Sequence, residues 1–195
     1  MTSFIAIAAI TLDGKIAKNS HQFSFDWTSK EDKKAFQAEL KKFDAVVVGS
    51  NTFKTAIEPL KKRNTIVLTS KVKNTIEKFP HVWFCNFKTI NLKAFISSLG
   101  LKKIAILGGS HVYTYCLEKN LIDELVLTIE PVVFGRGISL FAQPLPLPSR
   151  PTKPWRSWMG EGRPDLRSFS GGGSGGSKPQ NSRFTLTSIK KLNKQ

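Results

Sequence analysis

The chain has 195 residues, of which 40% are hydrophobic and 23% are charged, and its formal net charge is +16. This length and hydrophobic content favour one folded domain with a substantial core and exclude an intrinsically disordered chain. The positive charge would suit a nucleic-acid partner, but the lysines occur singly or in short pairs and form no stripe interleaved with aromatic residues, so the pattern does not favour one.

Signals for a membrane or for secretion do not appear in the sequence pattern. No apolar run reaches the roughly 18 residues that a membrane span needs. The apolar N-terminal segment lacks a basic leader, so we interpret it as a buried strand and not as a signal peptide. Cys85 and Cys116 have neither metal-site nor CxxC spacing, which predicts free buried thiols, a cytoplasmic location and no metal.

Strand and helix patterns alternate along residues 1–144. Continuous apolar runs predict strands that are buried on both faces, and apolar residues at helical spacing predict helices. In chain order we expect a strand at 3–12, a helix at 30–43, strands at 45–50, 64–71 and 81–86, a helix at 91–100, a strand at 102–109, a helix at 110–120 and a strand at 123–133. This alternation predicts an α/β fold with a mostly parallel, twisted central sheet and helices on both of its faces.

The composition changes after residue 144. Residues 1–144 contain two arginines, Arg63 and Arg136, whereas residues 145–182 gather arginine, tryptophan, proline and the run GGGSGGS. This segment shows no helical or strand period and has the composition of a linker. Residues 183–195 return to the earlier composition and begin with strand-like alternation. We therefore expect one domain made of 1–144 and 183–195, interrupted by a disordered insertion of foreign origin at 145–182.

The stretch WTSKEDKKAFQ, residues 27–37, predicts both the start of a helix and a binding residue. Thr28 and Glu31 have the spacing of a capping box, with Thr28 as the N-cap. Asp32 follows, and it shares a helix face with Phe36 four residues later. Glu31 can therefore help to start the helix while Asp32 meets a ligand.

Small and polar residues follow three of the predicted strands, in the turns GSNT (49–52), LTSK (68–71) and LGGSH (107–111). The carboxyl ends of parallel strands lie along one edge of a sheet, where ligands normally bind. Small residues let backbone N–H groups approach phosphates, and a helix that starts there adds its positive end. The three turns together predict an elongated anionic ligand such as a dinucleotide, although neither GxGxxG nor GxxxxGK[ST] is present.

The segments VVVGSNTF, NTIVLTSK and IAILGGSHVY resemble the NADPH-binding segments of the dihydrofolate reductase-like family, which includes the reductase domain of riboflavin biosynthesis. The resemblance covers 1–141 and 183–195. It implies NADPH as the cofactor, and the residues implied to contact it are Ala9, Ile16, Gly49, Ser50, Asn51, Thr52, Leu68, Thr69, Ser70, Lys71, Gly108, Gly109, Ser110, His111, Val112 and Tyr113. Ser50 stands where the family often has a basic residue, so Lys71 would have to supply the charge for the 2′-phosphate.

The substrate half resembles dihydrofolate reductases. The spacing of Trp27, Asp32 and Phe36 is similar to the family's loop tryptophan, pterin-binding carboxylate and phenylalanine against the p-aminobenzoyl ring. In the same way, PLKKR implies that Leu60 packs on that ring and that Arg63 pairs with the glutamate α-carboxylate.

Four further residues are implied at the same site. Thr128 corresponds to a strand threonine that hydrogen-bonds the carboxylate or its water, and Ile7, Ala9 and Tyr113 complete the implied substrate site.

The resemblance implies a main reading and two alternatives. The main reading is an NADPH-dependent reduction of 7,8-dihydrofolate to tetrahydrofolate, with the proton arriving through solvent. Because TLDGKIA and WTS are similar to segments of riboflavin-pathway reductases, the first alternative is reduction of a phosphoribosylated aminopyrimidine. The second is a non-catalytic protein that displays residues 145–170 to a partner.

The C-terminal segment raises a question about assembly. The family's sheet ends in an antiparallel hairpin, and RFTLTSIKK is similar to its first strand alone. An unpaired edge favours dimerisation through that strand, so we expect either a monomer or an edge-strand dimer, with an activity that the insertion and the shortened hairpin impair.

Overall fold

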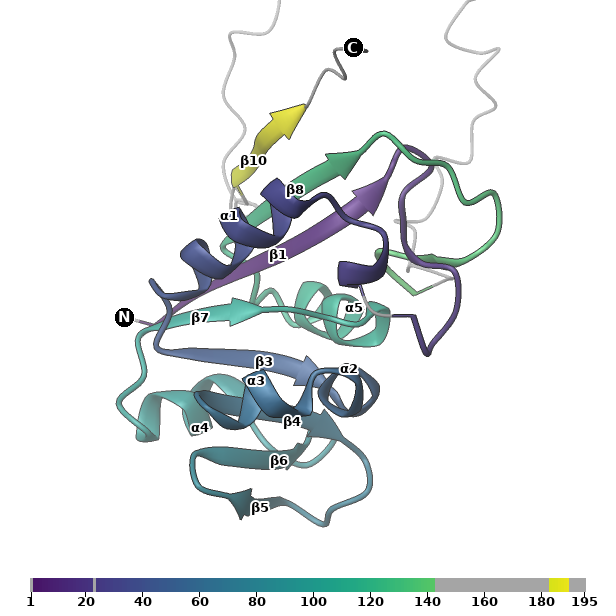
Figure 1. Cartoon of the computed structure of the whole chain (residues 1–195). Helices are drawn as coiled ribbons and strands as arrows, with labels where there is room; N and C mark the ends of the chain where they lie inside the picture. The colour runs from purple at the N-terminus through teal and green to yellow at the C-terminus, as the bar shows by residue number, and fades with distance from the viewer. Residues whose placement is uncertain (1, 23, 143–182, 190–195) are drawn as a thin grey trace, which may run out of the picture. The chain divides into compact units, whose positions relative to one another are not determined.

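The structure is a computed structural model, and it describes residues 2–22, 24–142 and 183–189. In this part of the chain an eight-stranded sheet has the order β10-β8-β1-β7-β3-β4-β6-β5 (Figure 1). Its strands are β1 (Ser3–Thr11), β3 (Ala45–Gly49), β4 (Asn64–Thr69), β5 (Thr75–Phe79), β6 (Val82–Asn86), β7 (Lys103–Ile106), β8 (Glu124–Glu130) and β10 (Arg183–Ile189). Every neighbouring pair is parallel except β5 with β6, which confirms the predicted sheet.

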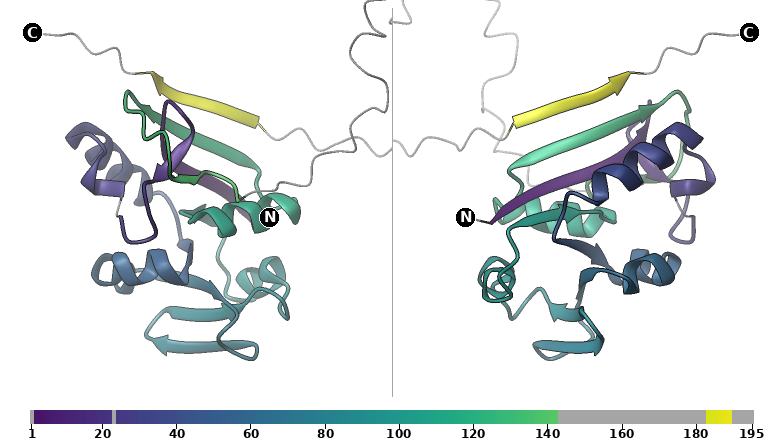
Figure 2. Two further views of the ribbon diagram at one scale, coloured as in Figure 1. Left: turned by 90° about the vertical axis from the view of Figure 1, so that its right-hand side faces the viewer. Right: turned by 60° about the vertical axis from the view of Figure 1, so that its left-hand side comes forward.

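Helices cover both faces of this sheet (Figures 1 and 2). One face packs against α1 (Lys30–Leu40), α2 (Ser50–Thr55) and α3 (Ile57–Lys61). The other face packs against α4 (Leu92–Ser98) and α5 (Ser110–Glu118). The predicted α/β architecture is therefore confirmed.

The central strands are buried because both of their faces meet helices. Val46, Val47 and Val48 of β3 are fully buried, although successive strand residues point to opposite faces. Continuous apolar runs are typical of such strands. Cys85 and Cys116 are free and buried, as predicted, and burial raises the pKa of their thiols to about 11 and about 12.

Several short elements were not predicted. The antiparallel strand β5 has a mostly exposed sequence without alternation, and it reverses into β6 at His81, whose φ is 63°. A two-stranded sheet pairs β2 (Lys15–Ala17) with β9 (Ile138–Ser139), and a 3-10 helix, η1 (Ser24–Asp26), precedes α1. These elements are too short for periodicity to reveal them.

The C-terminal strand differs from the expectation. β10 pairs parallel to β8 at the edge of the sheet, whereas the resemblance implies a strand of an antiparallel hairpin. The predicted insertion at 145–182 lies outside the described residues, as do residues 190–195, so the domain boundaries and the binding role of 145–170 stay predictions.

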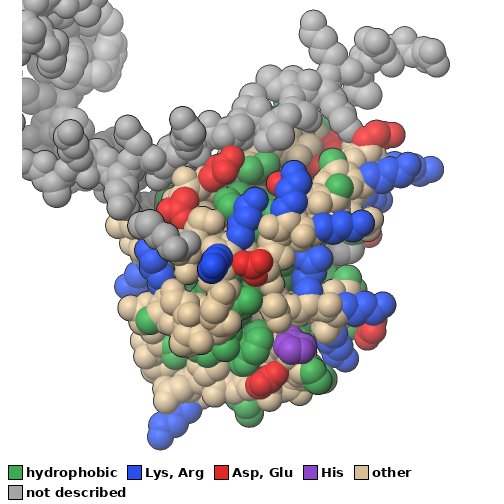
Figure 3. Space-filling view, turned by 90° about the vertical axis from the view of Figure 1, so that its left-hand side faces the viewer, with side chains coloured by type: hydrophobic (Ala, Val, Ile, Leu, Met, Phe, Trp, Pro, Cys, Tyr) green, Lys and Arg blue, Asp and Glu red, His purple; other side chains and the backbone are tan. Residues whose placement is uncertain are grey.

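The helices and the surface charges are relevant to whether a membrane or a nucleic acid could be a partner. None of the helices among the described residues is long and apolar enough to cross a membrane. On the face shown in Figure 3, Lys and Arg side chains are spread over the surface with acidic side chains between them.

The buried strands should carry most of the stability. Ile104 on β7 is fully buried, so Ile104→Ala should lower the free energy of unfolding by about 2–5 kcal/mol, because it leaves a cavity in a close-packed core. Ile76→Ala on β5, where the side chain is 47% exposed, should change it by less than about 0.5–1 kcal/mol. Urea denaturation followed by circular dichroism measures both, and equal losses would contradict this account of the core.

Candidate active site

A cavity of about 1270 Å³ lies at the carboxyl ends of the parallel strands, among residues that end β1, β3 and β4 and follow β7. Most residues that the resemblance implies as ligands line it. They are Ile7, Ala9, Ile16, Asp32, Phe36, Gly49, Ser50, Asn51, Thr52, Leu68, Thr69, Ser70, Lys71, Gly109, Ser110, His111, Val112, Tyr113 and Thr128. Four do not line it: Trp27, Leu60, Arg63 and Gly108.

Two glycine turns form the floor of the cavity. The Gly49 N–H donates to the Gly108 carbonyl at 2.8 Å, which joins the ends of β3 and β7. A Cβ on Gly49 would lie 3.2 Å from Cγ2 of Val112, so the approach favours glycine. Gly49 and Gly109 are the N-caps of α2 and α5, and neither helix has a side-chain cap. Backbone N–H groups at these helix starts therefore have no capping side chain in front of them.

Tyr113 forms a wall of the cavity and is tied to the sheet. Its hydroxyl donates to the Ile7 carbonyl at 2.6 Å, and burial strongly raises its pKa. Gly108, with φ of 87°, faces the tyrosine ring, and a Cβ there would overlap it. Gly108 thus leaves room for the Tyr113 ring, although it does not line the cavity itself.

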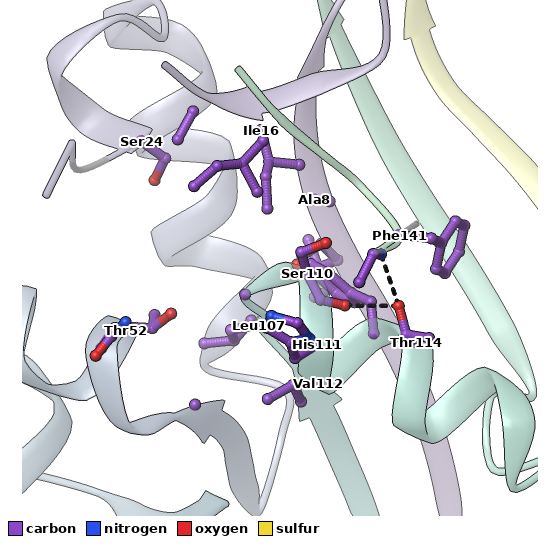
Figure 4. Close-up of a pocket in the computed structure, with 18 of the residues that line it drawn as sticks. Ala8, Ile16, Ser24, Thr52, Leu107, Ser110, His111, Val112, Thr114 and Phe141 are labelled. Atoms are coloured by element: carbon purple, nitrogen blue, oxygen red, sulfur yellow. Dashed lines mark hydrogen bonds between the residues drawn. The ribbon is translucent and has the colours of Figure 1, made fainter. Parts of the chain in front are cut away.

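The first turn of α5 is hydrogen-bonded to the segment at residues 141–142. Thr114 Oγ1 donates to the Ser110 carbonyl at 2.9 Å and accepts from the Ala142 N–H at 2.8 Å (Figure 4). Phe141 lies beside this contact and also lines the cavity. Residues far apart in sequence therefore hold the α5 end of the site together.

The start of α1 corrects the predicted helix cap. Ser29, not Thr28, is the N-cap, and its Oγ accepts from the Asp32 N–H at 3.2 Å. The Trp27 and Thr28 N–H groups both donate to the Ser24 carbonyl, at 3.3 and 3.1 Å, so the turn that begins in η1 reaches Thr28 and the extended backbone of the cap falls on Ser29. Asp32 is the buried residue of this helix and faces the cavity with Phe36.

Trp27, implied as a catalytic residue, and Leu60 and Arg63, implied as substrate-binding residues, have other surroundings. The Trp27 ring packs edge-on against Phe134, with centroids 5.2 Å apart. Leu60 is 6% exposed and belongs to the hydrophobic core under α2 and α3. The Arg63 guanidinium donates to the Leu40 carbonyl at 3.3 Å, at the end of α1. The spacing of Leu60 and Arg63 matches the family segment, but the two side chains have structural roles. Leu60 packs in the core, and Arg63 hydrogen-bonds the last residue of α1.

Sequence reasoning missed a rim of residues contributed by loops and by β2 and β9. These are Ala17, Asn19, Ser20, Gln22, Ser24, Phe25, Gly137, Ile138 and Ser139. Glu39, one turn beyond Phe36, also lines the cavity and pairs with Lys42. Helical spacing from Asp32 could have indicated Glu39, whereas the rim depends on pairing between distant segments that periodicity does not reveal.

Asp13 joins two segments that carry the rim. One carboxylate oxygen accepts from Thr11 Oγ1 at 2.6 Å and from the Phe134 N–H at 3.1 Å, and the other accepts from the Gly135 N–H at 2.9 Å. These hydrogen bonds hold the pKa of Asp13 below its ordinary value, with the Thr11 hydroxyl contributing most. The β1–β2 turn is therefore fastened to the segment that leads into β9.

Comparison with known proteins identifies the family. The family model described as dihydrofolate reductase matches residues 3–135. The chain belongs to the dihydrofolate reductase family. A curated relative in this comparison is the uncharacterized protein YwjB of Bacillus subtilis (strain 168), which is 30% identical over 144 residues, covering 68% of this chain and 79% of YwjB.

Solved structures share the fold of this dihydrofolate reductase family member. A putative riboflavin biosynthesis protein from Shewanella sp. PV-4 has a TM-score of 0.60 at 23% identity, covering 73% of this chain and 84% of its own. A pyrimidine reductase-like protein from Corynebacterium diphtheriae has a TM-score of 0.56 at 19% identity, with 73% and 80% covered.

A third solved structure is matched over less than half of its own length. It is a diaminohydroxyphosphoribosylaminopyrimidine deaminase/5-amino-6-(5-phosphoribosylamino)uracil reductase from Thermotoga maritima, with a TM-score of 0.55 at 19% identity, and the match covers 72% of this chain but 48% of that one. At these identities the likeness shows the fold, and the family match supports a reductase.

The Asp13 contacts predict a pH-dependent stability. The lowered pKa means that the ionised carboxylate stabilises the fold above the ordinary pKa of an aspartate, and this contribution is lost as the pH falls through the lowered value. Asp13→Asn should therefore be less stable than the wild type at neutral pH, and the difference should shrink in acid. Urea denaturation over a pH series measures this.

Asp44→Asn is the matched control. Its carboxylate accepts from the N–H groups of Lys102 and Lys103, both at 2.9 Å, and its pKa is also lowered. Both variants should show the acid-sensitive difference, but Asp13→Asn alone should speed proteolytic cleavage within 131–139. Equal cleavage in both variants would refute the assignment of Asp13 to the rim.

Proposed function

We propose that this chain is an NADPH-dependent reductase of the riboflavin-pathway pyrimidine reductase type, acting on a phosphoribosylated aminopyrimidine. The observation that carries the proposal is the placement of Leu60 and Arg63 outside the cavity. A folate substrate would need them for its p-aminobenzoylglutamate part. The fold of the riboflavin-biosynthesis and pyrimidine reductase-like proteins supports the same substrate class.

The charge at the α1 side of the cavity also argues against a folate tail. Glu39 faces the cavity one turn beyond Phe36, so the glutamate carboxylates of a folate would approach another carboxylate. Its partner Lys42 is at 2.6 Å, which leaves that lysine already engaged. Like charges at close range are destabilising, so a folate tail directed along α1 would be disfavoured.

The first two turns of α1, which carry Asp32 and Phe36, suit an aminopyrimidine. Asp32 is 9% exposed and faces the cavity, and a carboxylate can accept hydrogen bonds from the amino and ring N–H groups of a pyrimidine. Phe36 offers an apolar surface for the ring. The polar rim residues Asn19, Ser20, Gln22 and Ser24 offer donors and acceptors to the hydroxyl groups of a sugar.

The residues on the opposite side fit NADPH. The glycine turns at Gly49 and Gly109 let a pyrophosphate approach the backbone, and a Cβ on Gly109 would meet nothing closer than Thr52 Oγ1 at 3.7 Å. The uncapped start of α5 favours negative charge. Lys71, an exposed residue two positions after the end of β4, is the residue that would pair with a 2′-phosphate.

When bound, NADPH would supply a hydride to the sugar carbon of the ring-opened imine form of the ribosylamine, and the imine nitrogen would gain a proton. Asp32 would hold and orient the pyrimidine for this addition. The Tyr113 hydroxyl proton is held on the Ile7 carbonyl, so this phenol is not offered to the substrate. The proton would then come from water that reaches the cavity, and the contribution of the chain is mainly positioning.

Substrate turnover tests the proposal directly. The full chain is mixed with NADPH and either 5-amino-6-(5-phosphoribosylamino)uracil or dihydrofolate, and NADPH absorbance and product mass are followed. We expect the aminopyrimidine to be reduced and dihydrofolate to be a poor substrate. Asp32→Asn should lower turnover by about a hundredfold, since it removes the carboxylate that orients the substrate, with NADPH affinity unchanged. Faster turnover of dihydrofolate would overturn the substrate assignment.

Cofactor choice gives a second test, with Lys71. Lys71→Gln should weaken NADPH binding by roughly tenfold or more, because a charge-assisted hydrogen bond contributes about 1.5–3 kcal/mol. NADH, which has no 2′-phosphate, should bind equally to both proteins. Lys88→Gln, an exposed lysine outside the cavity lining, is the control. Equal loss of NADPH affinity in the two variants would mean that Lys71 contributes only general positive charge.

A further inference from the structure

Glu130 is a buried carboxylate outside the cavity lining. It ends β8, is 6% exposed, and does not contact the cavity itself. Its Oε1 accepts from the Ser29 N–H at 3.1 Å and from the Ser29 hydroxyl at 3.0 Å. A buried carboxylate is costly unless it is hydrogen-bonded, so both bonds to one residue fix the place of that residue firmly.

Ser29 transmits this contact to the first turn of α1. Its hydroxyl donates to Glu130 and at the same time accepts from the Asp32 N–H at 3.2 Å. Because the hydroxyl proton points to Glu130, a lone pair of the oxygen is directed to the helix. Asp32, whose side chain faces the cavity, is thereby joined to β8 through one serine oxygen.

A second contact supports the same junction. The Phe134 ring packs against Trp27, two residues before Ser29, and the Phe134 N–H donates to Asp13. The start of α1 is therefore held by the Glu130 carboxylate at the end of β8 and by the Phe134 ring in the segment after β8.

We propose that Glu130 is a positioning residue for Asp32: through Ser29 it fixes the first turn of α1 and so aims the Asp32 carboxylate into the cavity. The effect of Glu130 on substrate turnover rests on the proposed function. Its effect on the first turn of α1 does not. The family resemblance assigns no role to Glu130, and the predicted cap residues Thr28 and Glu31 are not the ones that form this junction.

The first experiment measures hydrogen exchange of residues 27–36 by mass spectrometry and needs no substrate. Glu130→Ala should speed exchange in this segment, because the cap loses its fixed acceptor. Glu58→Gln, which removes an exposed acid from the first turn of α3, should leave it unchanged. Unchanged exchange in Glu130→Ala would overturn the proposal, even if the protein reduced no tested substrate.

The second experiment separates positioning from general destabilisation. In the wild-type background Glu130→Ala should lower kcat/KM for the aminopyrimidine by on the order of tenfold to a hundredfold, since small misplacements of a catalytic group have such effects. NADPH affinity should stay unchanged. In the Asp32→Asn background the same substitution should cause no further loss, and an equal loss in both backgrounds would refute the positioning role.

Two other variants keep the test decisive. Glu130→Gln retains an oxygen acceptor for Ser29 and should keep most of the activity that Glu130→Ala loses. Ser29→Ala removes the shared hydroxyl and should reproduce the loss, which also serves if Glu130→Ala fails to fold. If Glu130→Gln were as impaired as Glu130→Ala, the charge of Glu130 and not its hold on Ser29 would matter, and the positioning role would be overturned.

Discussion

The hydrogen bond from the Gly49 N–H to the Gly108 carbonyl is the contact on which the arrangement of the cavity depends. It joins the ends of β3 and β7, two neighbours in the middle of the sheet, at the point where α2 and α5 begin. The approach is close, so a side chain on Gly49 would press on Val112 and one on Gly108 would overlap Tyr113. Two helix starts are thus brought to one edge by a backbone contact that favours glycine at Gly49 and depends on it at Gly108.

The opposite side of the cavity is built by contacts between distant parts of the chain. Ser29 and Glu130 are 101 residues apart in sequence, yet their hydrogen bonds set where α1 begins. The carboxylate of Asp32 then enters the site as a consequence of the helix start and of its place on the face shared with Phe36. The side of the cavity at Gly49 and Gly108 depends on the sheet, and the side at Asp32 depends on α1 being held against the end of β8.

Features governed by local sequence could be predicted, and features governed by distant pairing could not. Apolar runs indicated β1, β3, β4 and β7, because strands buried on both faces need them. The spacing of Asp32 and Phe36 indicated a common face, and both line the cavity. The cap was misplaced by one residue, because the turn before α1 is extended to Thr28 by a hydrogen bond from the Thr28 N–H to the Ser24 carbonyl, which the capping-box pattern does not reveal.

Leu60 and Arg63 show a different limit of sequence reasoning. Their spacing matches a family segment, but spacing does not say which way α3 turns relative to the cavity, and the structure directs Leu60 to the core and Arg63 to the end of α1. The rim residues of β2 and β9 were missed because their pairing joins segments about 120 residues apart, and neither strand is long enough to show a period.

The hydrogen bonds of Asp13 have a consequence for how the rim of the cavity can move. Because one carboxylate accepts from its own turn and from the backbone at 134–135, the β1–β2 turn cannot swing away while the other segment stays in place. β2 and β9, which line the cavity, are paired to each other as well. Any movement of this rim therefore carries both segments as one piece, or first breaks the carboxylate contacts. Opening of the cavity on this side is then a collective motion that depends on the hydrogen bonds of one aspartate.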